Sequence, residues 1–416
     1  MKRCFSILVL GMSVMVAAGV FAAPQVTLDC VQQRYPWNGL VDIDYTVSGI
    51  DGDSSSYAMT IDWASSAVGA TGMATRFDNL AGCDLPTMNG THRVTWNAAA
   101  DGLQFLAKDL KVTVRLVYAP VTEGEADFLI VDLSSGKNST EYPVRFARTG
   151  ADYSTEQFNC HLYKQTRLVL RKVRAGSFWM GVGNVATGTK RHKVRLSKDY
   201  WMGIFEVTQR QYTLVYGSNP SRDTTDATTE LAAERPVSQV NYDTIYTPTS
   251  GFLARLNDKV TYCGRKLGLF ALPTEAQWER ACRAGCENAY YWGEDTDANI
   301  DEYEWTKRNA NSISHVVGLK KPNGWGFYDF LGNACEWVRD WEYPYPAYEA
   351  EGETVDPCGM HWQRRKIIRG GYWHSASGSR NCGTRNTDQT NPNVTSMGWN
   401  PPLFAVCGFR LCKEVK

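Results

Sequence analysis

The feature that most constrains this chain is a set of short segments in which glycines stand between aromatic residues. They run from Asn323 to Trp341 (NGWGFYDFLGNACEWVRDW), from Arg369 to His374 (RGGYWH) and from Gly408 to Arg410 (GFR). Glycine permits turns that other residues rarely adopt, and aromatic side chains bury large areas. The segments therefore predict a C-terminal region of sparse, irregular secondary structure, with short strands joined by long loops.

Length and charge limit the kinds of protein that this chain can be. At 416 residues with 43% hydrophobic residues, it is long enough for two domains with separate cores. Lys+Arg and Asp+Glu are equal at 44 each, so no overall positive field attracts nucleic acid. We expect no nucleic-acid partner.

The first 22 residues have the pattern of a signal peptide. Two basic residues precede an apolar run from Cys4 to Val20, and Ala22 provides a small residue at the cleavage site. The rest of the chain contains no apolar run of the roughly 20 residues that a membrane helix needs. The sequence thus predicts an exported protein, periplasmic or extracellular, without a transmembrane segment.

Residues 24–150 are predicted to form an all-β domain. Val41, Ile43, Tyr45 and Val47 alternate with polar residues, as in half-buried antiparallel strands. About seven such runs, including 127–133 and 141–148, suggest an immunoglobulin-like sandwich. The cysteines of this region, at 30 and 83, predict the bridge Cys30–Cys83.

A polar linker near 147–160 is expected to lead into a second domain over residues 160–416. Two capping boxes occur there, Thr208 with Gln211 and Thr274 with Gln277. In a capping box, the side chain of the first residue accepts a hydrogen bond from the backbone N–H three positions later. The side chain at that later position accepts in turn from the backbone N–H of the first residue. Helices should therefore begin at about 209 and 275.

The aromatic and glycine segments, with RAGSFWMG (174–181), DYWMGIFEVTQRQY (199–212) and LPTEAQWERACRAG (272–285), resemble the formylglycine-generating enzyme or sulfatase-modifying-factor family. The resemblance covers residues 160–416. It implies an irregular α+β domain with a C-type-lectin-like fold, whose loops are fixed by aromatic packing, disulfides and calcium.

The resemblance also implies two disulfides, Cys282–Cys382 and Cys263–Cys412. It leaves five further cysteines unassigned, at positions 160, 286, 335, 358 and 407. Of these, Cys335 and Cys407 flank core motifs. They are expected to form a bridge or to fill the core as thiols, with a redox or metal pair as the alternative.

One calcium ion is implied by the turn YDFLGNACEW. Calcium prefers six to eight hard oxygen ligands, and family positions match the side chains of Asp329 and Glu336 and the carbonyls of Gly332 and Ala334. The alternative is that Asn333 and Glu336 only hydrogen-bond the turn.

The catalytic positions of the family hold other residues here. Formylglycine-generating enzymes oxidise a substrate cysteine with oxygen at copper(I), a soft ion that suits two thiolate ligands. The matching positions carry Ser375 and, for the second cysteine, about Arg380. A hydroxyl and a guanidinium cannot replace thiolates, so we expect the formylglycine chemistry to be lost and copper not to bind.

Two functions from different classes remain. The favoured one is an exported sulfatase-modifying-factor-like protein that binds a protein, peptide or glycan in its lectin-like cleft. The alternative is an oxygen-dependent oxidoreductase that acts on cysteine of a peptide through altered ligands. The residues expected to line the cleft, each with core or turn support as its alternative role, are Trp373, His374, Asn381 and Arg385.

Overall fold

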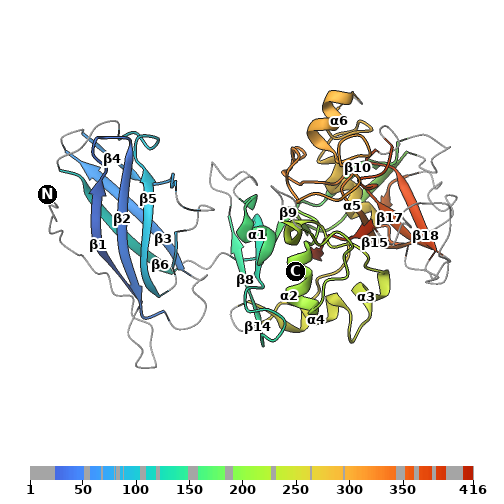
Figure 1. Cartoon of the computed structure of the whole chain (residues 1–416), viewed down its shortest axis with the longest axis horizontal. Helices are drawn as coiled ribbons and strands as arrows, with labels where there is room; N and C mark the ends of the chain where they lie inside the picture. The colour runs from blue at the N-terminus through green and yellow to red at the C-terminus, as the bar shows by residue number, and fades with distance from the viewer. Residues whose placement is uncertain are drawn as a thin grey trace. The chain divides into compact units, whose positions relative to one another are not determined.

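The computed structural model describes residues 24–50, 57–66, 69–78, 80, 85–87, 89–103, 109–118, 122–148, 158–182, 191–225, 231–262, 265–293, 296–342, 352–359, 365–376, 381–389 and 406–415. The chain divides into two compact units, Met1–Val121 and Thr122–Lys416 (Figure 1). The predicted signal peptide, residues 1–22, lies outside the described residues. No described helix is long and apolar enough to cross a membrane.

The N-terminal unit contains two antiparallel sheets that share one core. The first has the order β1-β2-β5, with β1 at Gln25–Gln33, β2 at Leu40–Ser48 and β5 at Gly90–Asn97. The second has the order β4-β3-β6, with β4 at Ala70–Met73, β3 at Tyr57–Ser65 and β6 at Lys111–Tyr118.

The alternation read from the sequence places the apolar face of β2 in this core. Val41, Ile43 and Tyr45 are fully buried, and they share a cluster with Trp63 of β3 and Trp96 of β5. The two tryptophan rings lie 5.5 Å apart, within the range of favourable aromatic pairs. The immunoglobulin-like assignment stays a prediction.

The domain boundary predicted near 150 is wrong by about 30 residues. Strands β7 (Phe128–Asp132) and β8 (Tyr142–Ala147) pair with each other, and β7 also pairs with β9 (Arg167–Val173). Both strands belong to the C-terminal unit. A period-2 pattern shows that a segment is a half-buried strand but does not show which sheet it joins.

The C-terminal unit is built around a seven-stranded sheet of order β14-β13-β8-β7-β9-β12-β20. Its remaining strands are β12 (Tyr200–Gly203), β13 (Val260–Tyr262), β14 (Arg265–Lys266) and β20 (Cys412–Glu414). A three-stranded sheet, β10-β11-β16, contains β10 (Gly176–Met180), β11 (His192–Leu196) and β16 (Thr354–Val355).

A four-stranded sheet, β18-β17-β15-β19, carries the glycine and aromatic motifs. It consists of β15 (Cys335–Trp341), β17 (Arg365–Arg369), β18 (Arg385–Gln389) and β19 (Cys407–Gly408). Helix α5 (Glu275–Arg283) lies beside β15 and β17 (Figure 1).

The other helices of this unit are short, as the sequence predicts for an irregular fold. They are α1 (His161–Gln165), α2 (Gln209–Tyr216), a 3₁₀ turn at Ala232–Glu234, α3 (Tyr242–Tyr246), α4 (Phe252–Lys259) and α6 (Asp297–Tyr303). The predicted starts at 209 and 275 are confirmed, because both capping boxes form with Thr208 and Thr274 as N-caps. The core beneath them is strongly aromatic, including Tyr200, Trp278, Phe327, Tyr328 and Phe330.

Candidate functional site

The turn between Phe327 and Glu336 adopts a backbone that few sequences allow. Asp329, Gly332 and Asn333 all have positive φ, at 54°, 82° and 54°. A Cβ on Gly332 would collide with the carbonyl oxygen of Trp305 and lie 2.7 Å from Cγ of Glu304. Aspartate and asparagine tolerate this region better than most residues, so the motif letters are explained by the shape of the turn.

Glu336 follows the turn and is bound on both oxygens by Arg410 of the GFR motif. Nε of Arg410 donates to the two oxygens at 2.9 and 2.8 Å, and a terminal nitrogen donates at 2.7 Å. The indole nitrogen of Trp278 adds a further donor at 2.7 Å. Both charged side chains are fully buried, so each compensates the desolvation of the other.

Glu206 is a second buried carboxylate at this turn, and the sequence reading did not single it out. Its oxygens accept from the Ala334 backbone at 2.9 Å and from the Asn333 side chain at 2.9 Å. Burial raises its pKa well above the ordinary value, and the charges of Asp329 and Glu336 raise it further. The sequence feature that could have identified this residue is a charged side chain, Glu206, inside the otherwise apolar run IFEV.

Asp329 completes this acidic cluster. It accepts the Gly318 backbone N–H at 2.6 Å, and burial raises its pKa to about 6. The Asn333 and Glu336 side chains, for which the sequence left hydrogen bonding of the turn as the alternative role, both form hydrogen bonds. Their partners are Glu206, His315 and Arg410, which lie outside the turn.

The donor set predicted for calcium does not fit an ion at Glu336. Both of its oxygens already accept from the Arg410 guanidinium, and a divalent cation there would lie against that positive charge. The Ala334 N–H points to Glu206. Among the described residues, no three His, Cys, Asp or Glu side chains are grouped to hold a metal. Calcium stays a prediction from the resemblance, and this arrangement argues against it.

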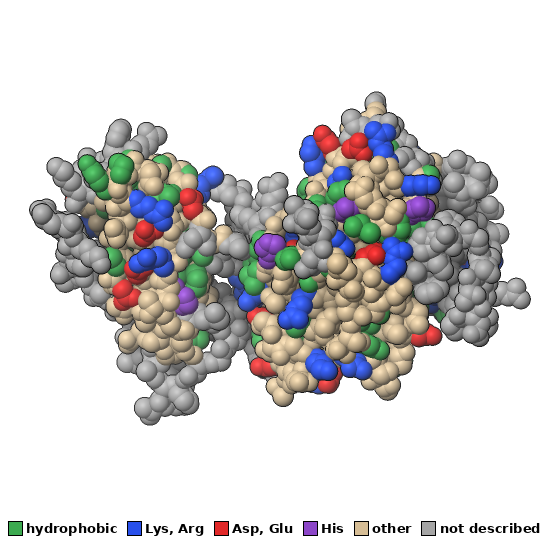
Figure 2. Space-filling view, viewed as in Figure 1, with side chains coloured by type: hydrophobic (Ala, Val, Ile, Leu, Met, Phe, Trp, Pro, Cys, Tyr) green, Lys and Arg blue, Asp and Glu red, His purple; other side chains and the backbone are tan. Residues whose placement is uncertain are grey.

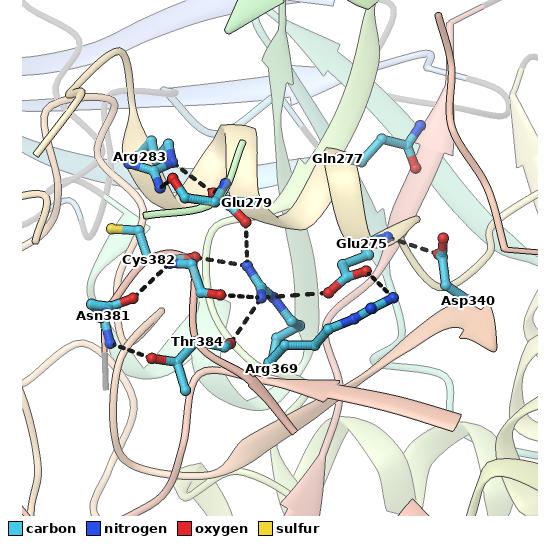
Figure 3. Close-up of polar contacts among 12 residues, drawn as sticks. Glu275, Gln277, Glu279, Arg283, Asp340, Arg369, Asn381, Cys382 and Thr384 are labelled. Carbon is cyan, nitrogen blue, oxygen red and sulfur yellow. Dashed lines mark hydrogen bonds and ion pairs between the residues drawn. The ribbon is translucent and has the colours of Figure 1, made fainter. Parts of the chain in front are cut away.

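A second buried ionic network ties α5 to β17 and to the segment after residue 381 (Figure 3). Arg369 lies between two glutamates of the helix, 2.6 Å from Glu279 and 3.4 Å from Glu275. Its guanidinium also donates to the carbonyls of Cys382 at 2.7 Å and Thr384 at 2.8 Å. Every charge in this group has a close partner, which is the pattern of a structural network.

Two of the four predicted cleft residues belong to this network or its turn. Arg385 pairs with Glu275 at 2.9 Å and its side chain is 9% exposed. Asn381 accepts the Gly383 backbone N–H at 3.0 Å and its own N–H donates to the Thr384 hydroxyl at 2.9 Å (Figure 3). For both, support of the turn accounts for the observed contacts.

The other two, Trp373 and His374, lie where three loops meet. The Arg222 guanidinium stands over the Trp373 ring at 5.4 Å and donates to the Ser312 carbonyl at 3.4 Å. Lys307 donates its backbone N–H to the Ser375 carbonyl at 3.2 Å. We call this surface the Trp373 loops, comprising residues 219–225, 306–313 and 372–376.

His374 is a partly buried imidazole of the Trp373 loops. It is half-buried, stacks on Tyr372 and packs edge-on against Trp373, and its Nδ1 has no hydrogen-bond partner in the structure. A buried polar atom left without a partner is costly. Nδ1 itself is not exposed to solvent, so a ligand that touches the partly exposed ring does not reach this atom directly.

Ser375 occupies the first catalytic cysteine position implied by the resemblance. Its hydroxyl accepts the Tyr372 backbone N–H at 3.1 Å, so it closes the RGGYWHS turn. Arg380 lies outside the described residues.

The predicted cysteine pairs have different outcomes. Cys282 and Cys382 are fully buried and in contact, and burial followed by this contact raises the pKa of the Cys282 thiol well above its ordinary value. Cys412 donates to Oε1 of Gln277 at 3.6 Å. Cys263 and Cys83 lie outside the described residues. The disulfides Cys282–Cys382, Cys263–Cys412 and Cys30–Cys83 therefore remain predictions.

A cavity beside Glu206 does not add a ligand site. Its cavity volume is about 10 Å³, enough for about one water molecule and far below the roughly 300 Å³ at which ligand pockets begin. It is lined mostly by apolar residues of β9 and the segment after β12, namely Leu168, Val169, Leu170, Phe205 and Val207.

Comparison with known proteins establishes the family. Residues 164–400 match the model of the sulfatase-modifying factor enzyme 1-like domain, more than half of the chain, and the chain belongs to this family. The mostly β C-terminal unit fits the C-type-lectin-like fold of that family.

Similar proteins include formylglycine-generating enzymes. The chain is 30% identical to the enzyme of Bos taurus over 160 residues, which cover 34% of this chain and 41% of the bovine protein. It is 36% identical to the enzyme of Streptomyces coelicolor over 113 residues, covering 24% and 35%. The chain thus spans about four tenths of the length of these relatives.

A solved structure supports the fold. Treponema denticola variable protein 1 superposes with a TM-score of 0.50 at 26% identity, over 60% of this chain and 96% of that one.

Proposed function

We propose that this chain is an exported protein of the sulfatase-modifying-factor family that binds a protein, peptide or glycan through the Trp373 loops and does not generate formylglycine. The proposed loss of formylglycine formation rests on the Ser375 hydroxyl, which accepts a hydrogen bond from the Tyr372 backbone N–H at 3.1 Å and so belongs to the turn. A hydroxyl there offers no thiolate for copper(I).

The binding half is supported by the composition of the Trp373 loops. The Arg222 guanidinium and the half-buried His374 imidazole lie against the Trp373 ring, which is itself buried. Arginine and aromatic side chains are enriched where proteins recognise partners. The described surface facing the viewer in Figure 2 mixes Lys and Arg with Asp and Glu, without one large patch of a single sign. That mixture favours a ligand other than a polyanion.

The alternative function, an oxygen-dependent oxidoreductase acting on peptide cysteine, has one observation in its favour. Cys335 and Cys407 form a close pair of sulfurs, 2.7 Å apart. Both residues are fully buried, so a peptide has no access to them in this conformation. We therefore rank this function second.

The test uses the full chain and two assays. In the first, the protein is incubated with copper(I), oxygen and a cysteine peptide of sulfatase type, and mass spectrometry follows formylglycine. We expect none, whereas a formylglycine-generating enzyme in parallel converts the peptide. Conversion by this chain would overturn the proposed loss of activity.

In the second assay, glycan and peptide arrays are probed with the wild type and two variants. We expect His374→Ala and Arg222→Ala to weaken binding of any hit at least several-fold. Arg115→Ala, which removes an exposed arginine of the N-terminal unit, serves as the matched control. Equal binding by all four proteins would contradict the assignment of the Trp373 loops.

A further inference from the structure

Two cysteines outside the family's bridges stand opposite each other on neighbouring strands. Cys335 opens β15 and Cys407 opens β19, and the two are register partners in a parallel pair. Seventy-two positions separate them in the sequence, yet their sulfur atoms lie 2.7 Å apart. Both side chains are fully buried.

This geometry is already close to that of a disulfide. Neighbouring strands lie roughly 4.8 Å apart, inside the range of about 4.4 to 6.8 Å that separates the Cα atoms of bridged cysteines. The sulfurs would have to approach by well under 1 Å to reach the bond length of about 2.05 Å. No rearrangement of the two strands is required.

A shared metal ion explains the pair less well. Two thiolates on one zinc ion, each at about 2.3 Å in a tetrahedral arrangement, stand roughly 3.8 Å apart, farther than these sulfurs. In addition, no group of three metal-binding side chains occurs among the described residues. The pair therefore lacks both the spacing and the additional ligands of a metal site.

We propose that Cys335 and Cys407 form a structural disulfide that is made during folding. The thiolate of one cysteine attacks a donor disulfide, small-molecule or protein-borne, to give a mixed disulfide, and the second thiolate then displaces the donor's thiol. The two cysteines lose two protons and two electrons in total, and the donor disulfide is reduced to two thiols. Because both side chains are fully buried, exchange takes place before the two strands are covered.

The bridge lies next to the Glu336–Arg410 ion pair, the most buried ion pair among the described residues. Glu336 directly follows Cys335, and Arg410 lies three residues after Cys407. Glu336 is also the register partner of Gly408. A covalent link one residue before this register pair fixes the two strands whose side chains close the Glu336–Arg410 contact, so it restricts the separation of those strands.

A peptide map of the wild-type chain decides the matter without any variant. The full chain is unfolded, reduced, refolded in a glutathione redox buffer, and then alkylated in denaturant without reductant. We expect protease digestion to release a linked peptide pair that contains Cys335 and Cys407. Alkylation of both residues, or linkage of either one to another cysteine, would overturn the proposal. The redox buffer makes the result independent of export and of ligand binding.

Accessibility supplies a second measurement. We expect dithiothreitol to leave the Cys335–Cys407 link intact in the native protein and to break it once denaturant is added. Loss of the link under native conditions would contradict a buried structural role. The Tm of oxidised and of reduced protein is then compared in the wild type and in the double variant Cys335→Ser with Cys407→Ser. We expect the difference between the two Tm values to be smaller in the variant than in the wild type. An equal difference in both proteins would also count against the bridge.

Discussion

Arg410 and Glu336 form a fully buried ion pair in which the guanidinium contacts both carboxylate oxygens, at 2.7 to 2.9 Å. The pair joins the turn after Phe327 to the C-terminal GFR motif. Arg410 also donates to the carbonyls of Gly203 and Tyr328, both at 3.0 Å. One arginine thus holds together segments drawn from three parts of the C-terminal unit.

The first prediction concerns removal of that carboxylate charge. Glu336→Gln leaves the Arg410 charge buried with a neutral partner, and breaking a buried pair typically costs about 3 to 5 kcal/mol. We expect a loss of this size in the free energy of unfolding, measured by denaturant titration. The control is Glu302→Gln, whose pair with Lys321 is about half exposed and should contribute no more than about 1 kcal/mol. Equal losses in both variants would contradict the account of Arg410.

The second prediction concerns calcium. Because Arg410 and Trp278 already saturate the Glu336 carboxylate, we expect added calcium or a chelator to leave Tm unchanged. A bound ion at 100 times its Kd would stabilise the folded state by about 2.7 kcal/mol, which a thermal melt detects easily. A clear fall in Tm on chelation would restore the calcium site implied by the resemblance.

The sequence predicted local features well and contacts between distant segments poorly. The helix starts at 209 and 275 follow from capping boxes within four residues, and both are confirmed. The boundary near 150 is wrong because β7 and β8 have the alternation of the strands before them. The strands that flank this pair in the sheet, β9 beside β7 and β13 beside β8, lie farther along the chain.

The same limit applies to the site. The motifs located the turn at Gly332 and the loop at Trp373, but the Arg410 partner of Glu336 and the role of Glu206 depend on pairings over 74 and about 130 positions. Residue identity alone carries no information on such partners. Of the buried network, only Glu279 and Arg283 have a local signal, since their spacing of four places them on one helix face.

The third prediction is a pH dependence with a definite sign. The folded-state pKa of Asp329 is raised by burial from 3.8 to about 6. Between these values the folded protein holds a proton that the unfolded chain has released, so stability falls as pH rises through this window. We expect the free energy of unfolding to increase when pH is lowered from 7 to about 5.

A variant separates Asp329 from other titrating groups. Asp329→Asn keeps an oxygen to accept the Gly318 N–H and removes the titration, so the slope between pH 4 and 6 should become flatter. Asp258→Asn is the control, because this carboxyl is 71% exposed. Between about pH 5 and 6, it should leave the change of unfolding free energy with pH the same as in the wild type. An identical profile for wild type and Asp329→Asn would show that this carboxyl does not drive the dependence.

The last prediction concerns the glycine at the centre of the site. Gly332→Ala places a methyl group against the Trp305 carbonyl and Glu304 on a backbone with φ of +82°. Positive φ costs a residue with a side chain about 1 to 2 kcal/mol, and forced overpacking typically adds about 1 to 3 kcal/mol. Gly268→Ala isolates the first effect, because φ there is +54° and a Cβ meets nothing within 4 Å. In urea titrations we therefore expect Gly332→Ala to lose more stability than Gly268→Ala. Equal losses would mean that the turn relaxes away from Trp305, and that its close packing does not hold the Glu336 and Asn333 side chains in place.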